Sequence, residues 1–192
     1  MTEYELFKVY LTTHPGAARR KDAKRAHEKL LAECVERIEQ LIHLVESDGV
    51  EVSFDDSSLQ PLNDWFIEQV NTRPPTEAER AHEEAVLGGQ VDLVRDYKLS
   101  RRTESLIIDI ALFIGELLIQ AAPHLKWNFV TKPKNDASYQ RTVLAGFQSV
   151  KNKRYHVDLE GVLVGYAYQI VAGSEHNQKE FVLLYETGLR LA

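Results

Sequence analysis

The strongest constraint on this chain is a run of seventeen mostly apolar residues at positions 106–122. Three polar side chains, Asp109, Glu116 and Gln120, interrupt the run. A helix that spans a bilayer needs about 20 apolar residues, and a carboxylate near its centre costs about 3 kcal/mol or more. We therefore expect a buried central helix in a water-soluble fold, with no membrane span.

Spacing and capping signals predict two helices in the first quarter of the chain. Apolar residues recur every three or four positions over 22–47, which predicts one long amphipathic helix that Asp22 caps. Thr2 and Glu5 have the spacing of a capping box, which predicts a short helix that ends near His14.

The middle of the chain carries similar signals. Pro61 suits the first turn of a helix that runs to about residue 70, and Thr76 with Glu79 repeats the capping-box spacing before a polar helix. Residues 91–97 are expected to add a helical turn or two. Ser100 is expected to cap the central helix.

The sequence period changes after the central helix. Segments 125–131 and 142–147 are rich in aromatic and β-branched residues, which predicts two strands joined by a polar turn. A lone hairpin is marginal in water, so we expect it to pack on the central helix or to recruit a third strand, either from a short candidate strand at 50–54 or from the chain near Tyr155.

These elements predict an α+β fold that is helix-dominated, with a central buried helix, surrounding helices and a small antiparallel β-hairpin or sheet. Two further helices are expected at 158–172, capped by Asp158, and from about residue 177 onward. A length of 192 residues favours a single domain, 1–192. The double proline at 74–75 leaves open a helical N-terminal lobe, 1–74, before a core, 75–192.

No motif names a reaction, a cofactor or a metal. Walker, GxGxxG, GxSxG and HExxH patterns are absent, and the one carboxylate–histidine pair of di-iron spacing, Glu79 and His82, has no counterpart. We therefore expect no cofactor and favour a binding protein over an enzyme. The lone Cys34 and the polar N-terminus favour a reducing, cytoplasmic setting, with Cys34 as a buried, inert thiol.

Polar residues of the central helix share one side. At about 100° per residue, Asp109, Glu116 and Gln120 fall with Arg102 and Ser105 within about 60° of arc. One interpretation is a ligand pocket at this stripe, in which Glu116 and Asp109 supply acid–base chemistry and Gln120 binds ligand together with Trp127. The other, which helix amphipathicity alone explains, is a wet edge or carboxylates paired with an arginine elsewhere.

Charge is unevenly distributed. Residues 28–68 hold eleven acidic side chains against two basic ones, a net of −9, and 126–154 have a net of +6. The acidic segment favours a protein partner with a basic surface, because complementary charge speeds association. The basic hairpin, which interleaves cations with aromatics, is an alternative site for nucleic acid or anions, less favoured because the whole chain has a net charge of −6. Its candidate residues are Lys132, Lys134, Arg141, Lys151, Lys153 and Arg154.

Two stretches resemble known protein families. Ser58-Leu59-Gln60-Pro61-Leu62-Asn63-Asp64-Trp65-Phe66 is similar to a helix start of the form S-L-x-x-L-D-x-hydrophobic in several uncharacterised bacterial families. Asp109-Ile110-Ala111-Leu112-Phe113-Ile114-Gly115-Glu116-Leu117-Leu118, followed by Trp127, resembles their A-x-Y-hydrophobic-G-E … W segment. Some of these families are domains of unknown function, and some are grouped with immunity proteins that neutralise polymorphic toxins. The resemblance implies an α+β domain without established chemistry and draws attention to Glu116 and Trp127.

Three functional hypotheses follow. The leading one is a non-enzymatic protein that acts through a protein partner, as an immunity-type or regulatory factor. The second is a small enzyme or ligand-binding domain with a pocket near Glu116, Asp109 and Trp127, and the third is nucleic-acid or anion binding by the 126–154 hairpin. The 22–47 helix is also long enough to pair with a second copy, which leaves a homodimer open.

Overall fold

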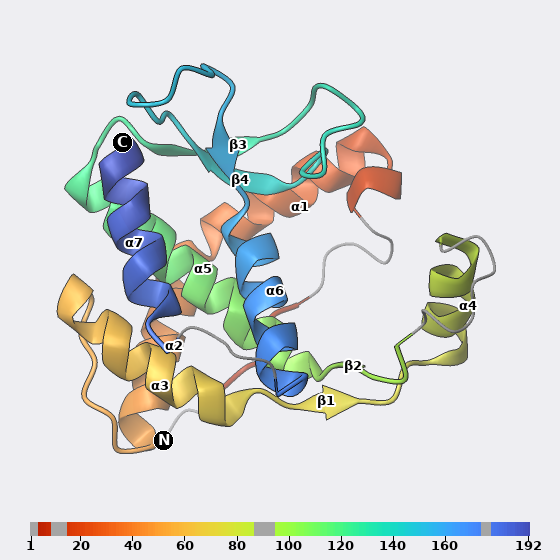
Figure 1. The fold of residues 1–192 in the computed structure, drawn as a ribbon, viewed down its shortest axis with the longest axis horizontal. Helices are drawn as coiled ribbons and strands as arrows, with labels where there is room; N and C mark the ends of the chain where they lie inside the picture. Colours follow the sequence, from red (N-terminus) through yellow and green to blue (C-terminus); the bar gives the residue numbers. More distant parts are fainter. Residues whose placement is uncertain (1–3, 9–14, 87–94, 174–177) are drawn as a thin grey trace.

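A computed structural model describes residues 4–8, 15–86, 95–173 and 178–192. Within them, seven α-helices and two small antiparallel sheets form an α+β fold that is mostly helical, as predicted (Figure 1). The helices are α1 (Arg20–Ala32), α2 (Cys34–Ser47), α3 (Leu59–Gln69), α4 (Glu77–Val86), α5 (Arg101–Ala121), α6 (Leu159–Val171) and α7 (Glu180–Leu191). The strands are β1 (Thr72–Arg73), β2 (Lys98–Leu99), β3 (Lys126–Phe129), β4 (Thr142–Ala145) and β5 (His156–Val157).

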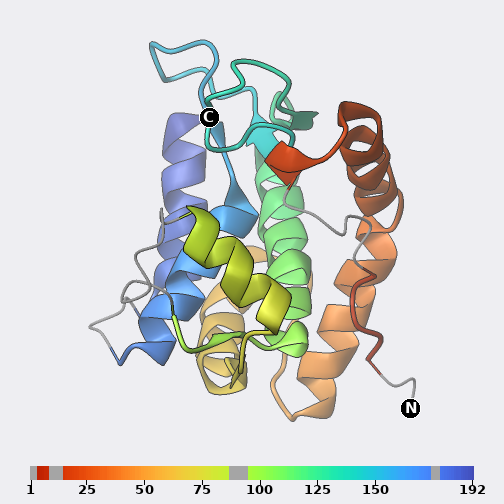
Figure 2. The same cartoon turned by 90° about the vertical axis from the view of Figure 1, so that its right-hand side faces the viewer.

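Helix α5 is the predicted central helix, and α2, α6 and α7 pack around it (Figures 1 and 2). Leu106, Ile110 and Ile114 are fully buried. Ser100 caps the helix as predicted, because its Oγ accepts a hydrogen bond from the Thr103 N–H at 3.1 Å. No helix in the described ranges combines the length and apolarity that crossing a membrane requires.

The predicted single helix over 22–47 is wrong in one respect, since α1 and α2 meet in a bend at Glu33. Backbone bonds from Glu33 N–H to the Lys29 carbonyl and from Arg37 N–H to the Glu33 carbonyl persist through it. The two halves have different neighbours: α2 packs on α5, whereas His27 of α1 lies 2.9 Å from the Thr142 hydroxyl of β4. The bend lets one amphipathic face reach both.

The predicted N-terminal helix is also wrong where it can be checked. Residues 4–8 have no helical structure, and Thr2 and His14 lie outside the described residues. The backbone of this segment bonds to the helices instead: Arg37 donates to the Glu5 carbonyl at 2.6 Å, and the Phe7 N–H donates to Ser105 Oγ at 2.7 Å. Docking on α2 and α5 has replaced local helix formation. The cap of α1 differs as well, because Arg19 precedes the helix and Asp22 lies within its first turn.

The candidate strand at 50–54 does not form. The chain turns there towards α3, and Ser58 Oγ accepts a hydrogen bond from the Ser53 N–H at 2.8 Å. Of the helical turns expected at 91–97, residues 91–94 lie outside the described part and 95–97 are not helical.

The predicted hairpin and its third strand are confirmed, with strand order β3-β4-β5 and Trp127 opposite Leu144. The third strand is the one next to Tyr155. The sheet meets α5 at Gly115, where a Cβ atom would lie 2.2 Å from the Trp127 ring. A side chain at position 115 would therefore displace Trp127, and the glycine permits this close approach.

Several predicted caps are present. Glu79 N–H donates to Thr76 Oγ1 at 3.2 Å while Glu79 Oε2 accepts from the Thr76 N–H at 2.8 Å, a complete capping box. Asp158 caps α6 through the Gly161 N–H at 2.9 Å. The short pair β1–β2 was not predicted, because two residues per strand give no readable alternation. Helices that precede the double proline at 74–75 pack on helices that follow it: α2 packs on α5, and α3 packs on α7.

Candidate functional site

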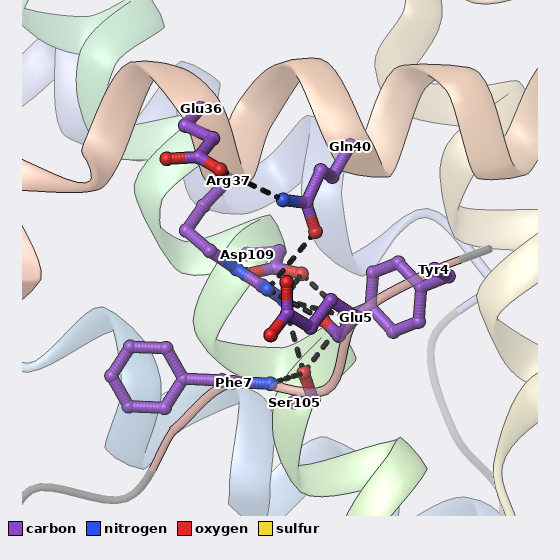
Figure 3. Close-up of polar contacts among 8 residues, drawn as sticks. All are labelled: Tyr4, Glu5, Phe7, Glu36, Arg37, Gln40, Ser105 and Asp109. Carbon is purple, nitrogen blue, oxygen red and sulfur yellow. Dashed lines mark hydrogen bonds and ion pairs between the residues drawn. The ribbon is translucent and has the colours of Figure 1, made fainter. Parts of the chain in front are cut away.

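Asp109, one of the two candidate carboxylates, lies in a buried polar cluster with Tyr4, Arg37 and Ser105 (Figure 3). Arg37 donates to both oxygens of Asp109, from Nε to Oδ1 at 2.7 Å and from Nη2 to Oδ2 at 2.5 Å. The Tyr4 hydroxyl donates to Oδ2 at 2.5 Å, and Ser105 Oγ accepts from Arg37 Nη2 at 3.1 Å. We call these four residues the closed cluster. The structure thus shows, for Asp109, the alternative in which a carboxylate pairs with a distant arginine.

The protonation of the closed cluster suits a structural role. Burial raises the pKa of Asp109, while the hydrogen bonds from Arg37 and Tyr4 oppose that change. Burial, with the nearby Asp109 charge, raises the pKa of Tyr4, so its hydroxyl keeps its proton. Burial lowers the pKa of Arg37, but the hydrogen bonds and charges of Asp109 and Tyr4 together outweigh burial and raise the pKa overall. Because Asp109 has no exposed surface, it cannot reach a ligand unless residues 4–8 leave.

The other candidate carboxylate, Glu116, has a different environment. Its Oε1 accepts a hydrogen bond from Trp127 Nε1 at 2.7 Å and lies 3.7 Å from Cys34 Sγ. Burial and the Glu116 charge raise the pKa of Cys34 to about 12, so the thiol is un-ionised and poorly nucleophilic. Gln120 is exposed at the end of α5. Neither Asp109, Glu116 nor Trp127 lines either of the two hollows described below.

A cavity of about 330 Å³ is lined by residues of α1, α5 and α6 and by Gln140, Arg141 and Thr142 at the start of β4. Small-molecule pockets typically span about 300–1,000 Å³ and are lined mainly by apolar groups with a few polar ones. The residues that form the wall of this cavity fit that description. Its apolar members include Phe7, Ala26, Leu30, Ile107, Ile108 and Val164.

Gln140 supplies the most unusual polar group of the wall. The residue is 4% exposed and has a left-handed backbone with φ 62°, a conformation that costs about 1–3 kcal/mol in a non-glycine residue. Its Nε2 donates to the carbonyls of Pro15 at 2.7 Å and Ala18 at 3.0 Å. Its Oε1 is buried and has no hydrogen-bond partner among the described residues. The amide thus ties the cavity wall to the segment before α1, and its acceptor oxygen is enclosed by protein.

Arg141, the residue after Gln140, pairs with two carboxylates. Arg141 lies 2.6 Å from Asp158 Oδ2 and 3.3 Å from Glu160 Oε1. Burial raises the pKa of Glu160; Arg141 opposes the rise, and Asp158 and Glu104 add to it. The Glu160 side chain is 42% exposed and lines the cavity, so this carboxyl is accessible although protein surrounds it. We call Gln140, Arg141, Asp158 and Glu160 the cavity cluster.

His27 borders the cavity from α1. Its Nδ1 lies 2.9 Å from Thr142 Oγ1, and its ring lies 5.4 Å from that of Phe129. Burial lowers the pKa of His27, so the imidazole is neutral at pH 7. It can donate or accept a hydrogen bond but adds no charge to the wall.

The candidate basic residues of 126–154 are divided by the structure. Arg141 is turned to the cavity cluster, whereas the other five are exposed on the β3–β4 and β4–β5 loops, at one end of the molecule (Figure 2). Phe147, an aromatic residue between them, packs against Tyr155 with ring centroids 5.3 Å apart. Nucleic-acid or anion binding by these loops therefore stays a prediction that depends on charge. The five exposed cations are Lys132, Lys134, Lys151, Lys153 and Arg154.

A second hollow, of about 680 Å³, lies between the end of α2 and α3 on the acidic part of the chain. Asp48, Asp64 and Glu68 line it together with Arg102. Within the described ranges, none of these three carboxylates lies within ion-pair distance of a lysine or arginine. No group of three His, Cys, Asp or Glu side chains in the same ranges could hold a metal ion.

The cavity residues could not be found from the sequence. His27 is more than a hundred positions before Gln140, and Gln140 is twenty positions before Glu160, so no local spacing groups the three residues. Comparisons of the chain with protein-family models, with curated proteins and with solved structures find no match. The functional conclusions below rest on the geometry of this chain.

Proposed function

We propose that this protein binds a small, largely apolar molecule in the cavity between α1, α5 and α6. The observation that carries the proposal is a cavity of about 330 Å³ whose wall is mostly apolar and includes a few polar residues, among them Gln140, Arg141 and Glu160. The strained backbone of Gln140 supports a role in recognition, because such strain concentrates at functional positions.

This proposal keeps the ligand-binding hypothesis but places the binding pocket at another part of the molecule. The predicted pocket was centred on Glu116, Asp109 and Trp127, on the polar stripe of α5. The cavity adjoins a neighbouring face of the same helix, where Glu104 and Ile108 lie roughly 100° away from the stripe. The two carboxylates of the stripe, Asp109 and Glu116, are already engaged in hydrogen bonds within the chain.

The experiment is a ligand-detected NMR screen of a small fragment library, with two matched tryptophan variants. Val164 lines the cavity, so Val164→Trp should fill it and abolish binding of fragments that the wild type binds. Val162 is on the same helix, is 37% exposed and does not line the cavity, so Val162→Trp should bind them normally. Equal binding by both variants, or no fragment bound by the wild type, would contradict the proposal.

A second candidate function keeps the leading sequence hypothesis, a protein partner recognised by the acidic surface, in an immunity-type or regulatory role. It is supported by the hollow lined by Asp48, Asp64 and Glu68, carboxylates without a lysine or arginine partner in the described structure. Such a hollow suits a basic side chain of the partner, and the surrounding charge would speed association.

The test is an affinity capture from the native host at low salt, with wild type, Asp64→Asn/Glu68→Gln and the control Glu39→Gln. Glu39 is exposed on α2 and does not line the hollow. A partner captured by wild type and control but lost from the double variant, and released at high salt, is the expected result. Failure to capture any protein, or equal capture by all three, counts against this function.

A further inference from the structure

We infer that the end of the molecule formed by α1 and the loops of the β3-β4-β5 sheet binds the phosphate backbone of a nucleic-acid duplex, without preference for base sequence. Three features of this end lead to that partner. They are the position of α1 beside the sheet loops, a set of exposed cations without acidic partners, and the lack of exposed apolar and aromatic side chains among them.

Helix α1 adds positive charge to the end of the molecule that carries the basic loops. Residues 19–25 hold five basic side chains and one acidic one, a net of +4. The Gln140 amide, near the end of the β3–β4 loop, donates to the carbonyls of Pro15 at 2.7 Å and Ala18 at 3.0 Å. The start of α1 therefore lies beside this loop, at the end of the molecule where the β4–β5 loop also lies (Figures 1 and 2). Two segments more than a hundred positions apart thus supply cations to the same end.

Most cations of this end are exposed and have no acidic partner. In α1, two acids are already used, because Arg19 pairs with Asp22 at 2.7 Å and Lys24 pairs with Glu28 at 3.3 Å. Three further cations near the start of α1 and the five exposed cations of the sheet loops form no ion pair within the described ranges. None of these eight lines the cavity or the acidic hollow. We call them the basic end: Arg20, Lys21, Arg25, Lys132, Lys134, Lys151, Lys153 and Arg154.

The composition of this surface favours nucleic acid over a protein or a membrane. Protein interfaces have an apolar centre with aromatic side chains and few lysines, and helices that bind membrane surfaces present large apolar side chains. The apolar face of α1 is turned inward instead, with Ala23 buried and Leu30 in the cavity wall. Protein–nucleic acid interfaces are polar and strongly positive, as the basic end is. The large apolar side chains that are exposed in the described residues lie elsewhere: Leu6, Val35, Phe54, Val162, Leu183 and Leu189.

The aromatic residues of the sheet favour a duplex over a single strand. Proteins that bind single strands stack the bases on accessible aromatic rings, but none of the five aromatic residues in 126–155 is exposed. Trp127 donates to Glu116 at 2.7 Å, and Phe147 packs against Tyr155. Binding then depends on phosphate contacts, which carry no sequence information and are strongest where the charge density of the nucleic acid is highest, in a duplex.

The acidic part of the chain does not cancel this attraction. Helix α3 and the end of α2 lie at the opposite end of the molecule from the sheet loops (Figure 2). The 14 residues of α2 alone span about 21 Å, about twice the Debye length at 0.1 M salt. Salt therefore screens the repulsion between the acidic end and a nucleic acid on the basic end. The net charge of −6 for the whole chain does not describe the charge that the duplex meets.

The test is a fluorescence anisotropy titration of the full chain at pH 7 and 50 mM salt. The probes are two labelled DNA duplexes of unrelated sequence and an oligothymidine of the same length. Both duplexes should bind with micromolar Kd values within about twofold of each other, and more tightly than oligothymidine. If about five phosphates are contacted, the affinity for duplex should fall about 500-fold between 50 and 200 mM salt.

Two double variants test whether both parts of the basic end contribute. Lys21→Gln/Arg25→Gln in α1 and Lys132→Gln/Lys134→Gln in the β3–β4 loop should each weaken duplex binding about tenfold and make the salt dependence less steep by about two contacts. The control Arg80→Gln/Arg95→Gln removes the same charge from cations outside this end, which already lie near Asp96 and over the Tyr168 ring. The control should change the affinity by less than about threefold.

Several outcomes would overturn the inference. Equal losses in the control and in the two variants would show that overall charge, and not this surface, attracts DNA. Tighter binding of oligothymidine would contradict a duplex partner, and an affinity that hardly changes with salt would contradict phosphate contacts. Sedimentation of the protein with vesicles of phosphatidylcholine and phosphatidylserine, without duplex binding, would assign the surface to a membrane.

Discussion

Helix α5 adjoins two arginine–carboxylate clusters on neighbouring faces, and they differ in how completely their polar groups are paired. In the closed cluster, Arg37 makes a two-point contact with Asp109, and Tyr4 and Ser105 take up further hydrogen bonds. In the cavity cluster, Arg141 is shared by two carboxylates, and the acceptor of a neighbouring glutamine has no partner in the described structure.

The difference shows why residue types alone do not identify a site. Both clusters contain an arginine paired with at least one carboxylate, and both include a carboxyl whose pKa burial raises, Asp109 or Glu160. What separates them is whether donors and acceptors match in number, because a matched buried pair is inert and an unmatched one favours a further partner. On this view the closed cluster stabilises the fold, whereas ligand binding next to the cavity cluster is our proposal.

The largest effect is expected at the centre of the closed cluster. Asp109→Ala leaves the Arg37 guanidinium buried without its counter-ion, so the free energy of unfolding should fall by about 3–5 kcal/mol in denaturant titrations. The control Glu39→Ala removes an exposed acid from α2 and should change it by less than about 0.5 kcal/mol. If the two variants were equally stable, the distinction between the clusters would be lost.

Tyr4→Phe sharpens the comparison, because it removes one hydroxyl from the closed cluster and keeps the ring. The loss of the hydrogen bond to Asp109 should cost about 1–2 kcal/mol. The raised pKa of Tyr4 also means that the folded state retains a proton that the unfolded state loses above about pH 10. Wild type should therefore lose stability as the pH rises beyond that value, and the variant should lose less. Parallel curves for the two proteins would argue against a buried, protonated Tyr4.

Glu116→Gln tests an intermediate case, a half-buried carboxylate with the Trp127 indole as its donor. The amide oxygen can still accept that hydrogen bond, so the loss should stay below about 1 kcal/mol. Trp127 fluorescence, read in a Trp65→Phe background, should shift only slightly. Glu116→Leu removes the acceptor and should cost more; an equal or smaller loss would show that this hydrogen bond contributes nothing.

The smallest effect on stability is expected at Glu160. Its side chain is partly exposed, so Glu160→Gln should change the free energy of unfolding by less than about 0.5 kcal/mol at pH 7. Because the pKa of Glu160 is raised, its contribution to stability is greatest at acidic pH and falls as the pH rises from its ordinary value through the folded-state value. The variant should lack this decrease. A loss as large as that of Asp109→Ala would place Glu160 in a second closed cluster.

The parts of the fold that could be predicted depend on local signals. The apolar run of α5, the caps at Ser100 and Asp158 and the capping box at Thr76 each lie within a few residues of the structure that they specify. The bend at Glu33 could not be predicted in the same way, because the apolar period continues through it and only the different neighbours of α1 and α2 require it.

The candidate site was less predictable than the fold. The polar stripe of α5 was recognised, and one of its interpretations, pairing with a distant arginine, holds for Asp109. The cavity depends on contacts between residues such as Gln140 and Pro15, which are 125 positions apart. No spacing within one helix or strand contains that information, because tertiary packing alone brings the two segments together.

Sequence separation within the closed cluster also has a consequence for the order of folding. Arg37 and Asp109 are 72 positions apart, and Tyr4 and Asp109 are 105 apart. During synthesis, Arg37 of α2 is translated long before Asp109 of α5, so the Arg37 guanidinium stays hydrated until α5 emerges. Contacts between such distant positions form slowly, because a long loop must close first. The part of the cavity wall that contains Phe7 can therefore assemble only after more than half of the chain has left the ribosome.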